Sequence, residues 1–283
     1  KKNTIFVIEA SSYQLDYSKI FRSKYAAILN LSPDHIERHK TIKRYFKAKL
    51  KLFEKQKKNQ LAFTNKNDAF IQKELRSKKF KTKIISVDTY EVDKFFKNIK
   101  NNYFLTEANK ENLSFALEIS KKLNLKKNLI VRSIENFKGL KYRQQIIFKK
   151  KNLTIINDSK STSFSSSVGL LKSNDKIYWI IGGIYKKGDI FNLPKKYFKN
   201  IKAFIYGRNK MFFNEKLKNK IDLQNFDNIE NALKKILFMI KKERSKKKII
   251  LFSPSAASFD TFNNFEERGM YFNKLIKKLF NEI

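Results

Sequence analysis

Cysteine is absent from the 283 residues, so the chain has no disulfide, no thiolate nucleophile and no cysteine-ligated metal. No apolar run approaches the roughly 18 residues that cross a bilayer, and no signal-peptide pattern opens the sequence. Glycine and proline are scarce, at seven and three residues, and the sequence contains no low-complexity linker or internal repeat. These absences predict a soluble, cytoplasmic protein.

Acidic residues are also few, since 26 Asp and Glu stand against 63 Lys and Arg, for a net charge of +37. Such an excess is typical of nucleic-acid-binding proteins, because neutralised phosphates release counterions. Only nine of the basic residues are arginine, however, the residue best suited to bidentate phosphate contacts. The lysines accompany abundant Asn, Ile and Phe, which A/T-rich codons encode. We therefore interpret the charge as a solvated surface and expect no nucleic-acid or membrane partner.

The apolar content is high enough for a folded chain. Hydrophobic residues make up 41% and aromatic residues 14%, so burial can offset the entropy of ordering. The length exceeds what one core usually organises, which favours two domains. Short β-branched runs predict strands in the first half, at residues 4–10, 25–32, 60–65 and 83–88. Helical spacing predicts helices at 33–57, at 109–123 and in a following segment that ends near 137.

After residue 142 the pattern changes, and predicted strands alternate regularly with predicted helices. Strands are expected at 153–158, 177–183, 203–207 and 248–254. Helices are expected at 163–172, after each of the next two strands, at 229–246 and from about 262. This alternation indicates a parallel sheet with helical crossovers. We place the domain boundary near 138–142, which gives domains 1–141 and 142–283.

Polar clusters follow the strands of the second half, at 157–162, 182–189, 206–209 and 253–260. In parallel α/β sheets ligands bind beyond the carboxyl ends of the strands, so these clusters should converge on one edge. "NDSKST" offers hydroxyls and Lys160 where the amides of a helix N-terminus are free to bind an anion. The glycine pair of "GGIYKKGD" permits close backbone approach, although a plain turn explains it equally well.

The first half carries its own candidate site. Glu9 ends a predicted strand, His35 follows another, and Lys49 lies on the next helix, so the three can meet at one sheet edge. A carboxylate there can hold Mg²⁺, which prefers hard oxygen ligands and shares them with nucleotide phosphates. The alternative is structural: Asp34 caps a helix, and Glu9 and His35 are ordinary surface groups.

The order and spacing of five segments together resemble the Mur ligase family, in its D-glutamate-adding branch. The segments are "EASSYQLD", "LNLSPDHIERH" with "YFKAK", "NDSKST", "GGIYKKGD" and "SPSAASFDTFNNFEERG". The resemblance implies an α/β fold, with the remainder of a central P-loop-type ATPase domain followed by a Rossmann-like domain that binds the amino acid. It also implies an ATP-dependent ligase that joins D-glutamate to UDP-N-acetylmuramoyl-L-alanine through an acyl phosphate, in peptidoglycan precursor synthesis. We expect a monomer.

The resemblance also implies residue roles. ATP and Mg²⁺ would be the cofactors, with Glu9, His35 and a carbamylated Lys49 as magnesium ligands or their support. Carbamylation needs a neutral amine, hence a lysine whose pKa is lowered by burial. Catalysis would involve Lys49, His35 and Lys160. The remaining matches are Ser11, Ser12 and Gln14 for the muramoyl substrate, Asn109, Arg143 and Asp158 for ATP, and Lys160, Thr162, Lys186, Ser258 and Phe265 for D-glutamate.

Several positions depart from the family pattern. Ala108 replaces a histidine, Thr106 replaces a glycine, and "GLKYR" replaces a Pro-His form before Arg143. Lys187 is adjacent to Lys186 and competes for its role. No "GxxxxGK[ST]" phosphate loop occurs in the sequence. We therefore predict that the chain is an N-terminally truncated fragment that is inactive alone.

Two other functions stay open at this point. A related folylpolyglutamate-type ligase shares the expected architecture and would differ in the amino acid that supports phosphate release. A basic nucleic-acid-binding module would instead gather its Lys and Arg on one face and bind in a salt-dependent way. A noncatalytic remnant is a third interpretation, suggested by Ala108.

Overall fold

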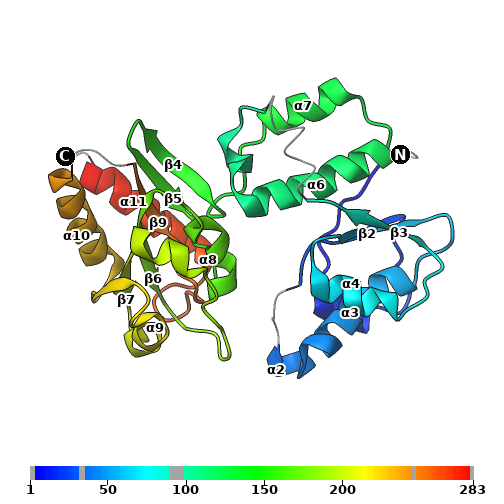
Figure 1. Cartoon of the computed structure of the whole chain (residues 1–283), viewed down its shortest axis with the longest axis horizontal. Helices are drawn as coiled ribbons and strands as arrows, with labels where there is room; N and C mark the ends of the chain where they lie inside the picture. Colours follow the sequence, from blue (N-terminus) through cyan, green and yellow to red (C-terminus); the bar gives the residue numbers. More distant parts are fainter. Residues whose placement is uncertain (1–3, 32–35, 90–98, 244–246, 281–283) are drawn as a thin grey trace. The chain divides into compact units, whose positions relative to one another are not determined.

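The computed structural model describes the chain except for residues 1–3, 32–35, 90–98, 244–246 and 281–283 (Figure 1). The chain divides into two compact units, Lys1–Asn136 and Phe137–Ile283. Each unit contains its own sheet. Among the described residues, no helix combines the length and the apolar character that a bilayer crossing requires.

The first unit is built on a three-stranded parallel sheet in the order β1-β2-β3. The strands are β1 (Tyr25–Ile28), β2 (Leu61–Asn65) and β3 (Lys83–Val87). Helices α3 (Ile42–Glu54) and α4 (Ala69–Arg76) bury their apolar sides against one face of the sheet. Phe115 of α6 (Glu107–Lys122) packs with Phe63 and Val87 on the other face (Figure 1). The remaining elements are α1 (Ser12–Tyr17), α2 (Ile36–His39), the 3₁₀ turn η1 (Asn102–Leu105) and α7 (Lys127–Glu135).

Two expectations for this unit are wrong. The apolar run at 4–10 forms no strand, and Ile5 to Ile8 are exposed, Val7 to 95%. A buried strand needs a hydrogen-bonding neighbour and cover on its faces, and the described residues supply neither, since β1 pairs only with β2. The helix expected at 33–57 is interrupted, because Lys40 adopts φ 66° and the Thr41 hydroxyl accepts a hydrogen bond from the Arg44 N–H, which starts α3 afresh.

The second unit contains a six-stranded sheet in the order β4-β5-β9-β6-β7-β8. Only β4 runs antiparallel to its neighbour; the other strands are parallel, which confirms the expected mainly parallel α/β sheet. The strands are β4 (Gln145–Lys150), β5 (Leu153–Asn157), β6 (Lys176–Gly182), β7 (Ile201–Tyr206), β8 (Asp222–Asn225) and β9 (Lys248–Phe252).

Helices cover both faces of this sheet. One face packs with residues of α8 (Phe164–Leu171) and α9 (Lys210–Leu217), around Trp179. The other packs with α10 (Ile229–Lys242) and α11 (Phe265–Phe280), where the Phe252 and Phe272 rings stack 4.3 Å apart. Burial on both faces explains why the central strands read as nearly continuous apolar runs.

Three details of this unit differ from the sequence prediction. The connection between β6 and β7 contains a 3₁₀ segment, η2 (Lys195–Asn200), in place of the expected α-helix. Strands β4 and β8 are not predicted from the sequence, because neither contains a buried residue and both carry polar side chains. Helix α11 begins at Phe265 instead of about residue 262.

Candidate functional site

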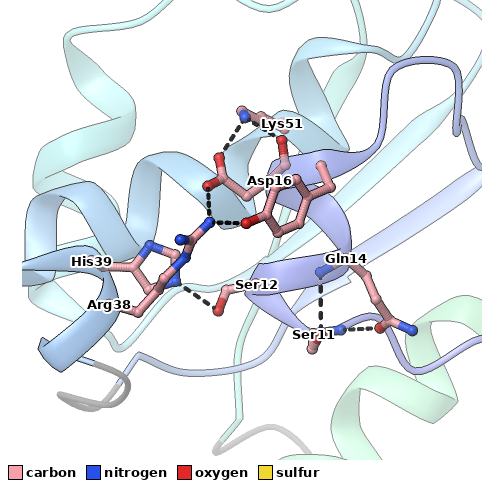
Figure 2. A network of polar contacts seen from close by, with 8 residues as sticks. Ser11, Ser12, Gln14, Asp16, Arg38, His39 and Lys51 are labelled. Atoms are coloured by element: carbon pink, nitrogen blue, oxygen red, sulfur yellow. Dashed lines mark hydrogen bonds and ion pairs between the residues drawn. The ribbon is translucent and has the colours of Figure 1, made fainter.

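Helix α1 presents two of the residues that we match to the muramoyl substrate. The Ser11 hydroxyl accepts a hydrogen bond from the Gln14 N–H at 3.2 Å, and the Gln14 side chain accepts one from the Ser11 N–H at 2.8 Å (Figure 2). This reciprocal capping box starts the helix. Both side chains are exposed, so they can face a ligand at the rim of α1 while they hold its first turn.

Ser12, the third such residue, is buried and points to a partner that we did not assign. Its hydroxyl lies 3.0 Å from Nε2 of His39, the last residue of α2 (Figure 2). The His39 ring lies between Tyr13 and Tyr45, with ring centroids at 5.8 and 5.4 Å. His39 therefore fixes Ser12 from a separate helix, a role that only three-dimensional proximity reveals.

Charged groups also join α1 to α2 and α3. Lys51 Nζ donates to Asp16 Oδ1 at 2.6 Å and to the Asp16 carbonyl at 2.9 Å, while Arg38 donates to the Tyr17 hydroxyl at 2.6 Å (Figure 2). The hydrogen bond from Lys51 lowers the pKa of Asp16, against a smaller opposing effect of desolvation. A cavity of about 400 Å³ opens beside these groups, lined by Asp16, Arg38, His39, Arg44, Lys47, Ala48 and Lys51.

Lys49 lies on α3, half-buried, with its ammonium 5.0 Å from the centre of the Tyr45 ring. Burial lowers the pKa of Lys49, and the negative charge of Glu9 opposes that shift. Lys49 borders a cavity of about 180 Å³, lined also by Ala10, Leu15, Ala27, Ile28, Leu29, Asn30 and Leu52. This cavity lies at the carboxyl end of β1, next to the position of Glu9 in the sequence.

The predicted magnesium set is only partly visible. Glu9 is exposed and is electrostatically coupled to Lys49. His35 lies outside the described residues. Among the residues that the structure describes, no group of three or more His, Cys, Asp or Glu side chains is arranged to hold a metal ion.

Asn109, matched to the nucleotide, is buried in the first turn of α6. Its side-chain amide donates to the Tyr103 carbonyl at 2.7 Å, and its N–H donates to the Thr106 hydroxyl at 3.3 Å. Thr106 thus caps α6 at the position where the family pattern has glycine. Asn109 holds the preceding 3₁₀ turn against the helix.

The loops that follow the strands of the second unit do meet at one edge, as the sequence indicates. The Gly182 N–H donates to the Pro254 carbonyl at 3.1 Å, and Ile184 and Ala257 exchange two backbone hydrogen bonds of 2.9 Å. The Asp158 N–H donates to the Phe252 carbonyl at 2.7 Å. Backbone hydrogen bonds therefore join the clusters at 182–189 and 253–260, and the cluster at 157–162 is held to the end of β9.

Asp158 is buried at this edge and accepts two hydrogen bonds. The Gln144 N–H reaches one carboxylate oxygen at 3.0 Å, and the Ser253 hydroxyl reaches the other at 2.8 Å. Burial raises the pKa of Asp158 to about 7, although both hydrogen bonds and the charges of Arg143 and Arg268 act to lower it. Arg143 itself is half-exposed.

Residues matched to D-glutamate come together from distant parts of the chain. The Lys160 ammonium lies 3.9 Å from the centre of the Phe265 ring, so the ends of "NDSKST" and the start of α11 form one cation–π contact. Thr162 is exposed nearby in sequence, whereas Ser258 is buried and its carbonyl accepts from the Thr261 and Phe262 N–H groups. Ser258 thus closes the turn that leads to Phe262.

Two adjacent lysines in the loop after β6, Lys186 and Lys187, differ in burial. Lys186 is half-buried, and burial lowers its pKa while the charge of Asp189 opposes that shift. Asp189 in turn accepts a hydrogen bond of 2.6 Å from the Phe164 N–H at the start of α8. Lys187 is exposed. The burial of Lys186 favours it as the lysine of this loop.

Arg268 is the main site residue that we did not assign. It is 1% exposed, and its guanidinium donates to the Ser159 carbonyl at 2.7 Å and the Ala256 carbonyl at 2.9 Å. It thereby ties α11 to the loops after β5 and β9. The only sequence signal was an arginine inside the aromatic "NFEERG" segment.

Parallel α/β units with polar loops at the carboxyl ends of their strands are typical of a class of ligand-binding proteins. Comparison of the sequence with known proteins identifies the family within this class. The Mur ligase middle domain matches residues 1–172. The chain belongs to the Mur ligase family.

Over 301 aligned residues the chain is 35% identical to the UDP-N-acetylmuramoylalanine--D-glutamate ligase of Rickettsia felis, covering 98% of this chain and 66% of that protein. The chain thus spans about two thirds of the length of this relative. Among solved structures, the MurF ligase from Thermotoga maritima in complex with ADP has a TM-score of 0.63 at 16% identity, covering 95% of this chain and 66% of that one. FolC from E. coli, in complex with DHPP and ADP, has a TM-score of 0.55 at 13% identity, covering 90% and 62%. At these identities the structural likenesses establish the fold alone.

Proposed function

We propose that this chain forms part of an ATP-dependent ligase that adds D-glutamate to UDP-N-acetylmuramoyl-L-alanine, in peptidoglycan precursor synthesis. The proposal is supported by the likeness of nearly the whole chain to a protein named for that reaction. The structural observation that carries it is the contact between Lys160 and Phe265, which lie more than a hundred residues apart in the sequence. Within this assignment, residues 1–141 belong to the ATP-binding domain and 142–283 to the amino-acid domain.

The amino acid would be bound at the strand-end edge of the second unit. D-Glutamate carries two carboxylates, and each needs cationic or hydroxyl partners to replace the water that it loses. We assign Lys160 and Lys186 as the cations, with Thr162 and Ser258 as hydroxyl groups of the same edge. Phe265 would hold Lys160 in place by its ring.

The activated substrate would be prepared on the first unit. The carboxylate of the muramoyl-alanine attacks the γ-phosphorus of ATP; the new C–O–P linkage forms and ADP leaves. The amine of D-glutamate then forms the C–N bond and expels phosphate. Magnesium would neutralise the phosphate charge that opposes both steps. Ser11, Ser12 and Gln14 would position the carboxylate, with Ser12 oriented by His39.

The residues present fit a magnesium site in their chemistry. Glu9 supplies a carboxylate, and the lowered pKa of Lys49 favours the neutral amine that carbamylation requires. A carbamate would give α3 two oxygens that share a negative charge, at the cavity by the carboxyl end of β1. His35 would complete the set.

On the nucleotide side, Arg143 is the most available of the three matched residues. Asn109 and Asp158 are buried and already hydrogen-bonded within the protein. We propose that Arg143 contacts phosphate directly, and that Asn109 and Asp158 mainly shape the surfaces against which the nucleotide lies.

Phosphate release from ATP tests the function in the full-length gene product. We expect release that requires both UDP-N-acetylmuramoyl-L-alanine and D-glutamate, and that L-glutamate or a folate substrate does not restore. Lys160→Met should abolish it, whereas Lys187→Met, which removes an exposed lysine of the neighbouring loop, should leave most of it. Release that depends on a folate would instead favour a folylpolyglutamate-type ligase.

A further inference from the structure

Five side-chain oxygens form a continuous hydrogen-bonded path from the buried Asp158 to the protein surface. Ser253 Oγ lies 2.8 Å from Asp158 Oδ2 and 2.6 Å from Ser167 Oγ. Ser167 Oγ lies 2.7 Å from Ser161 Oγ, which lies 2.8 Å from Ser166 Oγ. Every link is within the usual range of an O–H···O hydrogen bond.

This hydrogen-bonded path has a buried inner end and an exposed outer end. Ser253, Ser167 and Ser161 are all buried, whereas Ser166 is exposed in the first turn of α8. Ser255 Oγ also lies 2.6 Å from Ser167 Oγ, but it forms a side branch outside the path. Bulk water therefore reaches the path at Ser166, and the carboxyl group at its other end is enclosed.

When the Asp158 carboxylate is ionised, proton counting fixes the direction of the three inner links of the path. A serine hydroxyl donates one hydrogen bond, and Ser253 donates to the Asp158 carboxylate. Ser167 must then donate to Ser253, and Ser161 to Ser167. Ser166 can donate to Ser161 or to the Ser163 carbonyl, 2.6 Å away, so the outermost link can open and close.

The inner end is suited to exchange a proton near neutral pH. The pKa of Asp158 is raised to about 7 by burial. The charged groups that act on it are Arg143, from the segment before β4, and Arg268, from α11, and both favour the ionised form. The outer end lies in the same short stretch as Lys160 and Thr162, the residues assigned to D-glutamate.

We propose that Ser166, Ser161, Ser167 and Ser253 form a proton relay that carries the proton released by the attacking amine inward to Asp158. The proposal rests on the proposed function. As the amine nitrogen bonds to the acyl carbon and the C–O bond to phosphate breaks, the nitrogen gives its proton to Ser166. Each hydroxyl passes its own proton to the next oxygen, and the Asp158 carboxylate receives the last. Reversal returns the proton to solvent after the product leaves.

A pair of single-hydroxyl deletions tests the relay in the full-length gene product. Ser167→Ala removes the central link, and Ser255→Ala removes a hydroxyl that is equally buried and contacts the same atom but lies off the path. We expect Ser167→Ala to lower kcat by roughly a hundredfold with KM for D-glutamate nearly unchanged, a magnitude typical of lost proton transfer. Ser255→Ala should keep the wild-type kcat. If thermal unfolding shows that Ser167→Ala does not fold, Ser161→Ala replaces it.

A spectroscopic measurement tests the path without turnover. The carbonyl stretch of protonated Asp158, identified by its loss in Asp158→Asn, is followed by infrared spectroscopy after a rapid pH jump. After the pH jump, the rate at which this carbonyl band changes should be lower in Ser167→Ala than in wild type or Ser255→Ala, by about tenfold or more. Equal responses in the three proteins, or equal kcat losses in both serine variants, would overturn the relay. If wild type shows no D-glutamate-dependent phosphate release, the proposed function fails, and the infrared measurement still decides whether the path carries protons.

Discussion

The two units differ in how completely their sheets are covered. In the second unit, helices pack on both faces of six strands, and the polar loops at the strand ends are fixed by buried hydrogen bonds. In the first, three strands carry the sheet, and the apolar segment at 4–10 lies exposed beside it. The site of the second unit is thus organised by its core, whereas that of the first depends on surface helices and their polar contacts.

The largest expected effect comes from the buried guanidinium of the second unit. Arg268→Met keeps similar bulk but leaves the Ser159 and Ala256 carbonyls without their donors. We expect a loss of about 4 kcal/mol in the stability of this unit, because each buried acceptor left without a donor costs about 1–3 kcal/mol. Hydrogen exchange resolved by segment should show increased opening of 137–283 alone.

A surface arginine of the first unit serves as the control for that variant. Arg132→Met on α7 removes the same functional group from an exposed position and should change stability by less than about 0.5 kcal/mol. If both variants act equally, or if Arg268→Met loosens the first unit as much as the second, the contrast between the units is wrong.

The glycine at the end of β6 should give the next largest effect. A Cβ at Gly182 would fall on the Tyr206 carbonyl oxygen of the neighbouring strand, well inside van der Waals contact, so Gly182→Ala must push β6 and β7 apart. We expect a loss of about 3 kcal/mol, measured by denaturant unfolding. Gly188→Ala is the matched variant, because φ there is also positive, at 79°, but nothing lies within 4 Å. It should lose only about 1 kcal/mol, from backbone strain; equal losses would exclude the steric explanation.

Asp158 should make the second unit lose stability as the pH rises toward neutrality, whereas Asp16 makes the first unit lose stability in acid. The pKa of Asp158 is raised on folding from 3.8 to about 7, so its contribution is complete below pH of about 4 and is lost as pH rises through about 7. Between pH of about 5 and about 7 the wild-type unit should lose about 2 kcal/mol relative to Asp158→Asn, which mimics the protonated form. Unfolding curves of both proteins at several pH values measure the difference. Parallel curves would mean that Asp158 titrates as an ordinary carboxyl group.

The sequence predicted the second unit more completely than the first, for physical reasons. A strand buried on both faces has a continuous apolar run, so β5, β6, β7 and β9 were recognisable. The edge strands β4 and β8 carry polar residues and were missed. At 4–10 an equally apolar run predicts a strand that does not form, because composition does not reveal whether a hydrogen-bonding neighbour exists.

Candidate site residues also differ in how readily the sequence reveals them. Motifs predict Lys160 and Phe265 as site residues, and the structure brings the two side chains into contact. His39 and Arg268 were missed, because each acts on a residue that is close only in the folded chain. Local spacing suggests candidate residues within one motif, but it does not reveal the side chains from other segments that hold those candidates in place.

The smallest effect is expected at the ion pair that joins α1 to α3 in the first unit. Lys51→Met removes the donor to Asp16, but both side chains are about one-third exposed, so solvent screens the pair and the loss should be about 0.5 kcal/mol. The lowered pKa of Asp16 means that this contribution exists above the unfolded pKa and vanishes as acid protonates the carboxylate.

Thermal unfolding at low and high salt should show a difference between wild type and Lys51→Met that shrinks with salt and in acid. Lys47→Met, an exposed lysine on the same helix, should show neither trend. A loss as large as that of Arg268→Met, insensitive to salt, would place a buried electrostatic site in the first unit and remove the distinction between the two.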